Sequence, residues 1–319
     1  MAVFAASVAS GCSVSVDFGG DSFRCDEEPK LCPDGRECLM GRCVVPGSTP
    51  DATPDGNSET GGFSTPTRIE GLSALMADDD DVSFSADRLF VAFNSNRGGG
   101  GDIWSSTRAS IDDEWTEPVL EQALSSADQE STVGVSADGL SVVFGSNRTG
   151  SLGGRDVYLS TRDDRDAPWS TPINVTSLNS TATDAANWIS NDHSLVLLDS
   201  RRDGESRLYV ATLASSGDYD VVEISELTSG DGEFAGRFAA NRLVLTFHSD
   251  RPTGVGNGDI YIAKRDSINQ PFGTPTLFED INSPALDEDA WLSDDLCYIA
   301  FTTDDENGDR EIFKSRCIE

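Results

Sequence analysis

Basic residues are scarce in this chain of 319 residues. The only lysines are Lys30, Lys264 and Lys314, and the 23 Lys and Arg residues face 56 Asp and Glu residues, so the formal net charge is −33. A surface this acidic repels phosphate backbones and anionic lipid headgroups. The composition therefore excludes nucleic acid as a partner. It leaves open whether the acidity serves cations or basic partners, or solubility in a salty habitat.

The chain also lacks the short motifs of several enzyme classes. It contains no Gly-x-Ser-x-Gly, no His-Glu-x-x-His, no phosphate-binding glycine loop and no calcium loop of EF-hand pattern. Its two histidines, His193 and His248, occupy different positions of the repeat described below, which favours incidental polar residues over a functional pair. These absences leave carboxylates as the remaining candidates for catalysis.

Sustained helical periodicity is missing, and an internal repeat with a period near 50 residues is present instead. The segment Phe144-Gly-Ser-Asn-Arg148 has four counterparts, which begin at Phe93, Leu198, Phe247 and Phe301. An apolar residue stands nine positions before each copy. These residues are Phe84, Val135, Ile189, Phe238 and Leu292. Repeats of this length indicate a solenoid, an array or a propeller.

Each repeat has the pattern of four short strands. In the first copy, Asp81–Ser85 and Leu89–Phe93 flank a turn, a glycine-rich turn leads to Asp102–Trp104, and a fourth strand follows Pro118. Proline is tolerated at the start of an edge strand, where an N–H group is not needed. Four strands per repeat are typical of a propeller blade. We therefore predict an all-β fold with five blades of four strands.

The two ends of the repeat array predict how the ring closes. The fifth repeat stops after its third strand, near Cys317, and its missing fourth strand has a copy before the first repeat, where Phe63–Leu72 matches Phe272–Ile281. An N-terminal segment is thus expected to supply the outer strand of the last blade, so that no sheet edge is left incomplete. A linear array would have no reason for this permutation.

Taken together, these motifs resemble the WD40-like propeller repeats of TolB type. The matching residues are Ser136-Ala-Asp-Gly139, Phe144-Gly-Ser-Asn-Arg148 and Gly258-Asp-Ile-Tyr261. The resemblance covers about residues 63–319 and implies the propeller fold. Such blades serve binding, assembly and accessory roles, so it implies no single function. The separate α/β domain and six blades of the Tol-system protein have no counterpart here.

Residues 1–12 resemble the end of a bacterial lipoprotein signal. Small apolar residues lead up to Cys12, which the resemblance implies as the site of lipid attachment. The apolar run is too short to span a bilayer. We therefore expect an exported protein of the bacterial cell envelope, on the outer membrane or in the periplasm, that meets the membrane only through a lipid anchor. The alternative is a disordered tail on a cytosolic protein.

The remaining six cysteines are expected to form disulfides. Residues 13–45 contain a cluster without enough chain for a core of its own, which predicts a knot of two disulfides with three possible connectivities. Its cysteines are Cys25, Cys32, Cys38 and Cys43. A zinc site is the alternative, but the spacings fit paired zinc ligands poorly. Cys297 and Cys317 lie in the fifth blade and are expected to form a cross-strand bridge. Residues 46–62 have the composition of a flexible linker.

Acidic loops and basic turns are expected on one face of the propeller. The loops that enter each blade carry carboxylates, and the turns between the second and third strands carry arginines, so salt bridges within or between blades are the simplest expectation. The residues are Arg97, Arg148, Arg202 and Arg251, with Glu130, Asp184, Glu233 and Glu288. Blade five departs from this pattern because Asp305 replaces the arginine.

A cation site is the sharper prediction for the seam between blades five and one. Two acidic loops without a local counter-charge would meet there and repel each other, which a calcium ion with oxygen ligands would relieve. The candidate ligands are Asp79, Asp80, Asp81, Asp304 and Asp305. The alternative is that both loops extend into solvent, where salt screens the repulsion. No other cofactor is expected.

The function expected from these features is that of an envelope-anchored binding or scaffold module, monomeric, for an unknown envelope protein or glycan. No catalytic residue is assigned. The alternative is a carboxylate-dependent glycan hydrolase, because five-bladed propellers include glycosidases with inward-facing carboxylates. Two or three carboxylates in a deep pocket at the channel mouth would favour the enzyme. A shallow mouth with carboxylates paired to arginine would favour the binding module.

Overall fold

The computed structural model describes residues 37–39, 42–44, 62–74, 76–305 and 307–318. The chain divides into two units, residues 1–57 and 58–319. In the first, β1 (Glu37–Leu39) and β2 (Arg42–Val44) form an antiparallel hairpin. The predicted lipid attachment at Cys12 and the predicted knot at residues 13–45 rest on positions or side chains outside the described part of the chain.

The second unit is a ring of five antiparallel sheets, each with four strands. Blade one consists of β4 (Asp79–Phe84), β5 (Phe90–Ser95), β6 (Asp102–Thr107) and β7 (Val119–Leu120). Blade two consists of β8 (Glu130–Val135), β9 (Ser141–Ser146), β10 (Asp156–Thr161) and β11 (Ile173–Asn174). Blade three consists of β12 (Asp184–Ile189), β13 (Leu195–Ser200), β14 (Arg207–Leu213) and β15 (Tyr219–Glu223).

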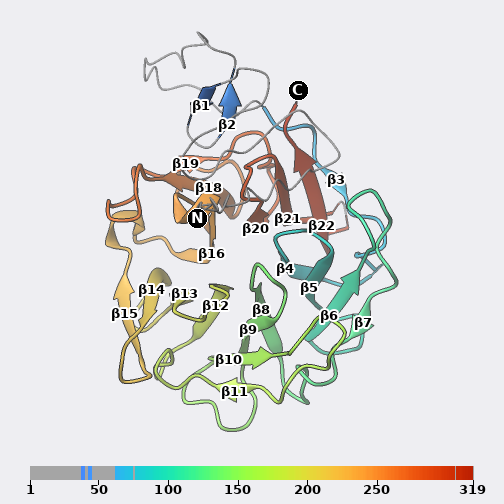
Figure 1. Ribbon diagram of the computed structural model, residues 1–319, viewed down its shortest axis with the longest axis vertical. Coiled ribbons are helices and arrows are strands. Elements are labelled where there is room, and N and C mark those ends of the chain that lie inside the picture. Colours follow the sequence, from blue (N-terminus) through green and yellow to red (C-terminus); the bar gives the residue numbers. More distant parts are fainter. Residues whose placement is uncertain (1–36, 40–41, 45–61, 75, 306, 319) are drawn as a thin grey trace, which may run out of the picture. The chain divides into compact units, whose positions relative to one another are not determined.

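Blades four and five complete the ring, with the first strand of every blade innermost (Figure 1). Blade four consists of β16 (Glu233–Ala239), β17 (Val244–Ser249), β18 (Asp259–Lys264) and β19 (Thr276–Leu277). Blade five consists of β20 (Asp287–Leu292), β21 (Tyr298–Asp304), β22 (Arg310–Arg316) and β3 (Thr67–Arg68). The only helical segments among the described residues are short 3₁₀ turns, and none is long and apolar enough to span a membrane. The prediction of a five-bladed, all-β propeller is confirmed.

Strand β3 closes the ring as the sequence predicted. It pairs with β22, with Arg68 opposite Phe313, and an isolated bridge joins Phe63 to Cys317. Phe63 is buried and contacts Phe278 edge-on, with ring centroids 5.2 Å apart. The N-terminal strand therefore completes both the sheet and the core of blade five. The expected disulfide between Cys297 and Cys317 is also present, on the same blade.

The repeated Ser-x-Arg segment joins the strands within each of blades one to four. In blade two, Arg148 donates from Nε to Ser146 Oγ and from Nη2 to Glu130 Oε1, over 3.0 and 2.9 Å, and its guanidinium stacks on Tyr158. Equivalent ion pairs join Arg97 to Asp79, Arg202 to Asp184 and Arg251 to Glu233. Because a buried carboxylate is costly without a partner, this recurring pair accounts for the acidic residue at the start of the inner strand in blades one to four.

A β-bulge interrupts every inner strand and ties neighbouring blades together. Four bulge residues have positive φ, between 49° and 58°. They are Asp81, Thr132, Ala235 and Asp289. A bulge leaves an amide outside the ladder, and carboxylates of the preceding blade accept three of these N–H groups. Thr132 donates to Asp81, Ala235 donates to Asp199 and Asp81 donates to Asp289, over 2.6, 3.1 and 3.3 Å.

Candidate functional site

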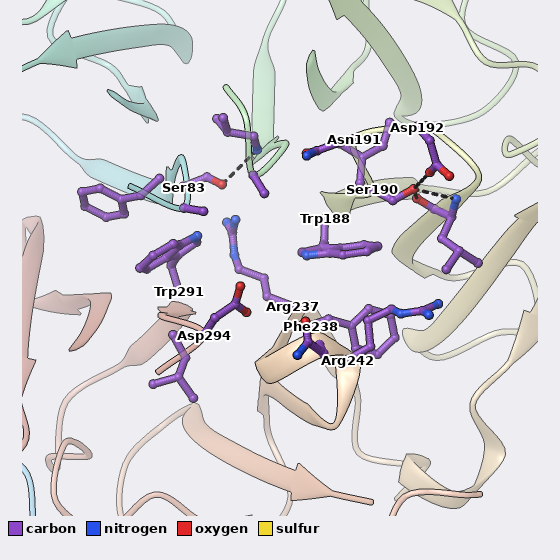
Figure 2. Close-up of a pocket in the computed structure, with 18 of the residues that line it drawn as sticks. Ser83, Trp188, Ser190, Asn191, Asp192, Arg237, Phe238, Arg242, Trp291 and Asp294 are labelled. Carbon is purple, nitrogen blue, oxygen red and sulfur yellow. Dashed lines mark hydrogen bonds between the residues drawn. The ribbon is translucent and has the colours of Figure 1, made fainter. Parts of the chain in front are cut away.

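A cavity of about 570 Å³ opens at the end of the channel where the inner strands run into their hairpin turns. The inner strands contribute Ser83 from β4, Trp188 from β12, Arg237 from β16 and Trp291 from β20. These residues share one position of the repeat. Figure 2 shows Arg237 between the two tryptophans. The size of the cavity and its mixture of aromatic and polar side chains are those of a small-molecule site.

Phenylalanines fix both indole rings in this pocket. Trp188 meets Phe238 edge-on and Trp291 is tilted against Phe84, with centroids 5.2 Å apart in each pair. Both tryptophans remain partly exposed and line the cavity. The pocket is therefore bounded by two preorganised aromatic surfaces from blades three and five.

The polar rim of the pocket comes from blades three, four and five, and blade four contributes Asn241 and Arg242. Asn191 and Asp294 line it at a hairpin position where blades one and two carry Ala86 and Ala137. Asp192 lies beside Asn191. Hydrogen bonds from Ser190 Oγ and from the backbone amide and hydroxyl of Ser194 lower the pKa of Asp192 to about 2. The rim is thus polar on one side of the channel and methyl-lined on the other.

Arg237 forms the floor of the pocket and is only 2% exposed. Its Nη1 donates to the carbonyl oxygen of Asn187 and its Nη2 to that of Val133, both over 3.0 Å. Burial lowers the pKa of Arg237, while the carboxylates of Asp289 and Asp81 oppose this shift. Arg237 therefore lines the pocket and also interacts electrostatically with an acidic cluster near the beginnings of the inner strands.

That acidic cluster consists of carboxylates at the beginnings of the inner strands and one on β13. Its members are Asp80, Asp81, Asp199, Glu288 and Asp289. Arg310 donates from Nη1 to Asp80 Oδ2 over 3.0 Å, and its Nε lies 2.9 Å from Glu288 Oε1. Burial raises the pKa of Glu288 to about 9 and that of Asp81 and of Asp199 to about 7. Burial raises the pKa of Asp80 and Asp289 as well.

The structure separates the residues expected to bind calcium. Asp80 and Asp81 belong to the channel cluster, whereas Asp79 pairs with Arg97 and Asp305 accepts hydrogen bonds within its own turn. The expected absence of a counter-charge at this seam is wrong, because Arg310 supplies one from the start of β22. The expected equivalence of Glu288 with Glu130 is also wrong, because Asp287 occupies that position in blade five. Glu288 pairs with Arg310 rather than with a turn arginine.

Sequence reasoning missed the pocket residues and the position of His248. Aligning the repeats places Ser83, Gly134, Trp188, Arg237 and Trp291 in one column, and this column varies more in size and charge than its neighbours. His248 falls in the column of Asn94, Asp199 and Thr302, which faces the next inner strand. Variation among otherwise regular repeats was the available signal, because the scaffold itself does not require it.

Comparisons with known proteins support the fold and nothing narrower. No family model and no curated protein matches the chain. Among solved structures, a thermostable family-43 glycoside hydrolase has a TM-score of 0.51 at 12% identity, over 78% of this chain and 92% of that one. The Bacteroides ovatus xyloglucan PUL protein GH43B has a TM-score of 0.50 at 14% identity, over 78% and 53%.

TolB from Acinetobacter baumannii is a third similar structure, with a TM-score of 0.49 at 16% identity. The alignment covers 75% of this chain and 54% of that chain, so this protein spans about half the length of TolB. At 12% and 14% identity, the similarity to the two glycoside hydrolase structures describes the fold alone.

Proposed function

We propose that this protein is a non-catalytic binding propeller that holds a glycan in the pocket between Trp188 and Trp291. The observation that carries the proposal is the pair of partly exposed indoles, each held by a phenylalanine. Aromatic faces bind the C–H surfaces of sugar rings at little entropic cost, and the polar groups of Asn191, Asp192 and Asp294 suit hydroxyl groups.

Titration of intrinsic tryptophan fluorescence with a panel of cell-envelope oligosaccharides tests this proposal. The wild-type chain should bind at least one member, and Trp188→Ala and Trp291→Ala should each weaken the affinity by about tenfold or more. Trp115→Phe is the matched control, because Trp115 lies outside the pocket. Absence of binding across the panel would reject the glycan as the ligand. Wild-type affinity in both alanine variants would also reject it. Retention of an envelope protein by the same chain would then favour a protein partner.

A carboxylate-dependent glycan hydrolase is the second candidate. A buried carboxyl with a pKa of about 9, Glu288, beside several other carboxyl groups is a pattern found in acid–base catalysis. Against it, Glu288 and Asp80 share Arg310, and Asp81, Asp199 and Asp289 bond bulge amides, so each has structural work. Release of reducing sugar by wild type but not by Glu288→Gln would establish the hydrolase.

We also propose that the protein is exported to the cell envelope and anchored through Cys12. The disulfide between Cys297 and Cys317 supports an oxidising compartment, and the small residues before Cys12 support lipid attachment. Cys12→Ser, expressed behind a complete export signal, should move the protein from the membrane fraction to the soluble fraction, because acyl chains would provide the membrane affinity. Unchanged partitioning would contradict the anchor.

A further inference from the structure

His248 lies against two carboxylates that it does not hydrogen-bond. Its ring stacks on Phe234, with centroids 5.0 Å apart and planes at 17°. Its Nε2 is 3.9 Å from Glu288 Oε2, and its Nδ1 is 4.0 Å from Asp289 Oδ1. Both distances are longer than a hydrogen bond allows. One potential metal-ligand atom from each of the three residues lies within 4.8 Å of the other two.

Each carboxylate is held by one oxygen and presents the other to the imidazole. Glu288 directs Oε1 to Arg310 Nε and Oε2 to His248. Asp289 accepts the Asp81 amide on Oδ2 and directs Oδ1 to His248. Partners that fix one oxygen and leave the other free are the arrangement found around metal ligands.

Unpartnered polar atoms within the triad itself provide a further observation. His248 Nδ1 has no hydrogen-bond partner among the described residues, and neither has Glu288 Oε1, which meets Arg310 only as an ion pair. Buried polar atoms without partners are uncommon in folded proteins, and two of them in one triad favour a ligand there.

We propose that His248, Glu288 and Asp289 bind a divalent transition-metal cation at this end of the channel. One imidazole and two carboxylates suit manganese, iron or zinc, since these ions accept mixed nitrogen and oxygen ligands. The cation would lie among the carboxylates and offset their mutual repulsion. None of the three ligands is an aspartate that was expected to bind calcium. None of them lines the glycan pocket.

Binding of Mn²⁺ to the full chain after chelator treatment tests the site. The ion suits oxygen and nitrogen ligands rather than sulfur, and loss of its free electron paramagnetic resonance signal reports binding. We expect one ion per chain. His248→Gln and Glu288→Gln should each weaken the affinity by about tenfold or more, whereas His193→Gln and Asp128→Asn should not.

Thermal melting guards against misfolded variants. Mn²⁺ should raise the melting temperature of the wild type and of both controls, but not that of His248→Gln or Glu288→Gln. Absence of stoichiometric binding by the wild type would overturn the proposal. It would also be overturned if His248→Gln, folded as judged by circular dichroism, kept the wild-type affinity.

Discussion

Arg237 on β16 donates a hydrogen bond to the carbonyl oxygen of Val133 on β8, two blades away, over 3.0 Å. Its other terminal nitrogen binds the carbonyl of Asn187 on β12, so one side chain links blades two, three and four. Gly134 allows the backbone of β8 to approach that of β12 closely, because a Cβ at this position would lie 2.5 Å from the carbonyl carbon of Asn187. The centre of the ring is thus held by polar contacts.

We expect Arg237→Met to lower the free energy of unfolding by about 3–5 kcal/mol. The substitution leaves two buried carbonyls without donors and removes the cation that faces Asp81 and Asp289. Urea unfolding followed by circular dichroism measures the change. Arg242→Met, at the partly exposed rim, is the control and should change stability by less than about 0.5 kcal/mol. Equal midpoints for the two variants would contradict the central role of Arg237.

Stability should fall as the pH rises from 7 to 9. The folded-state pKa of Glu288 is about 9 against an ordinary 4.5, so its contribution is fully present below about pH 4 and is lost as the pH rises through 9. Over this interval the loss amounts to about 2 kcal/mol. The pKa values of Asp81 and Asp199 are about 7, so most of their contribution to stability is already lost when the pH has risen to 7.

Thermal melts in chelator measure this dependence. Glu288→Gln should flatten the decline between pH 7 and 9, and the exposed control Glu117→Gln should leave it unchanged. His248 acts in the opposite direction at lower pH, since burial lowers its pKa to about 4, so its contribution is lost as the pH falls from 6.5 through 4. The same slope in wild type and Glu288→Gln would show that Glu288 does not titrate as described.

Removing the disulfide should destabilise the propeller. Cys297 and Cys317 are 20 residues apart, and closing a loop of this length contributes about 3 kcal/mol by restricting the unfolded chain. The double variant Cys297→Ser/Cys317→Ser should therefore unfold at lower urea concentration than the oxidised wild type. Urea unfolding of the wild type after its disulfides have been reduced with a thiol reductant serves as the second measurement. Identical midpoints in all three samples would mean that the bridge adds no stability.

The closing strand should be indispensable to cooperative unfolding. A chain that begins at Ser73 loses β3 and the buried side chains of Phe63, Ile69 and Leu72, and it exposes the edge of β22. We expect a broad, non-cooperative thermal transition for this chain and a sharp one for a chain that begins at Gly61. Two equally sharp transitions would show that blade five does not depend on its N-terminal strand.

Much of the fold followed from repetition. The blade count, the closing strand and the Cys297–Cys317 bridge are legible in the sequence because each depends on residues that recur at equivalent positions or on strands that are neighbours along the chain. The Ser-x-Arg segments belong to the same class, since Arg148 reaches Glu130 within its own blade. Local turn chemistry and the period of the repeat carry that information.

The sites were decided by tertiary structure. Bulges in the inner strands change which side chains face the channel, so alternation along the sequence could not assign Asp81 or Asp289 to it. His248 meets Glu288, and Arg310 meets Asp80, only because packing brings separate blades together around one axis. The sequence by itself determined the repeating scaffold, which needs only local pairing. The ring alone determined which of its irregular residues stand together, since their contacts span blades and carry no periodic signal.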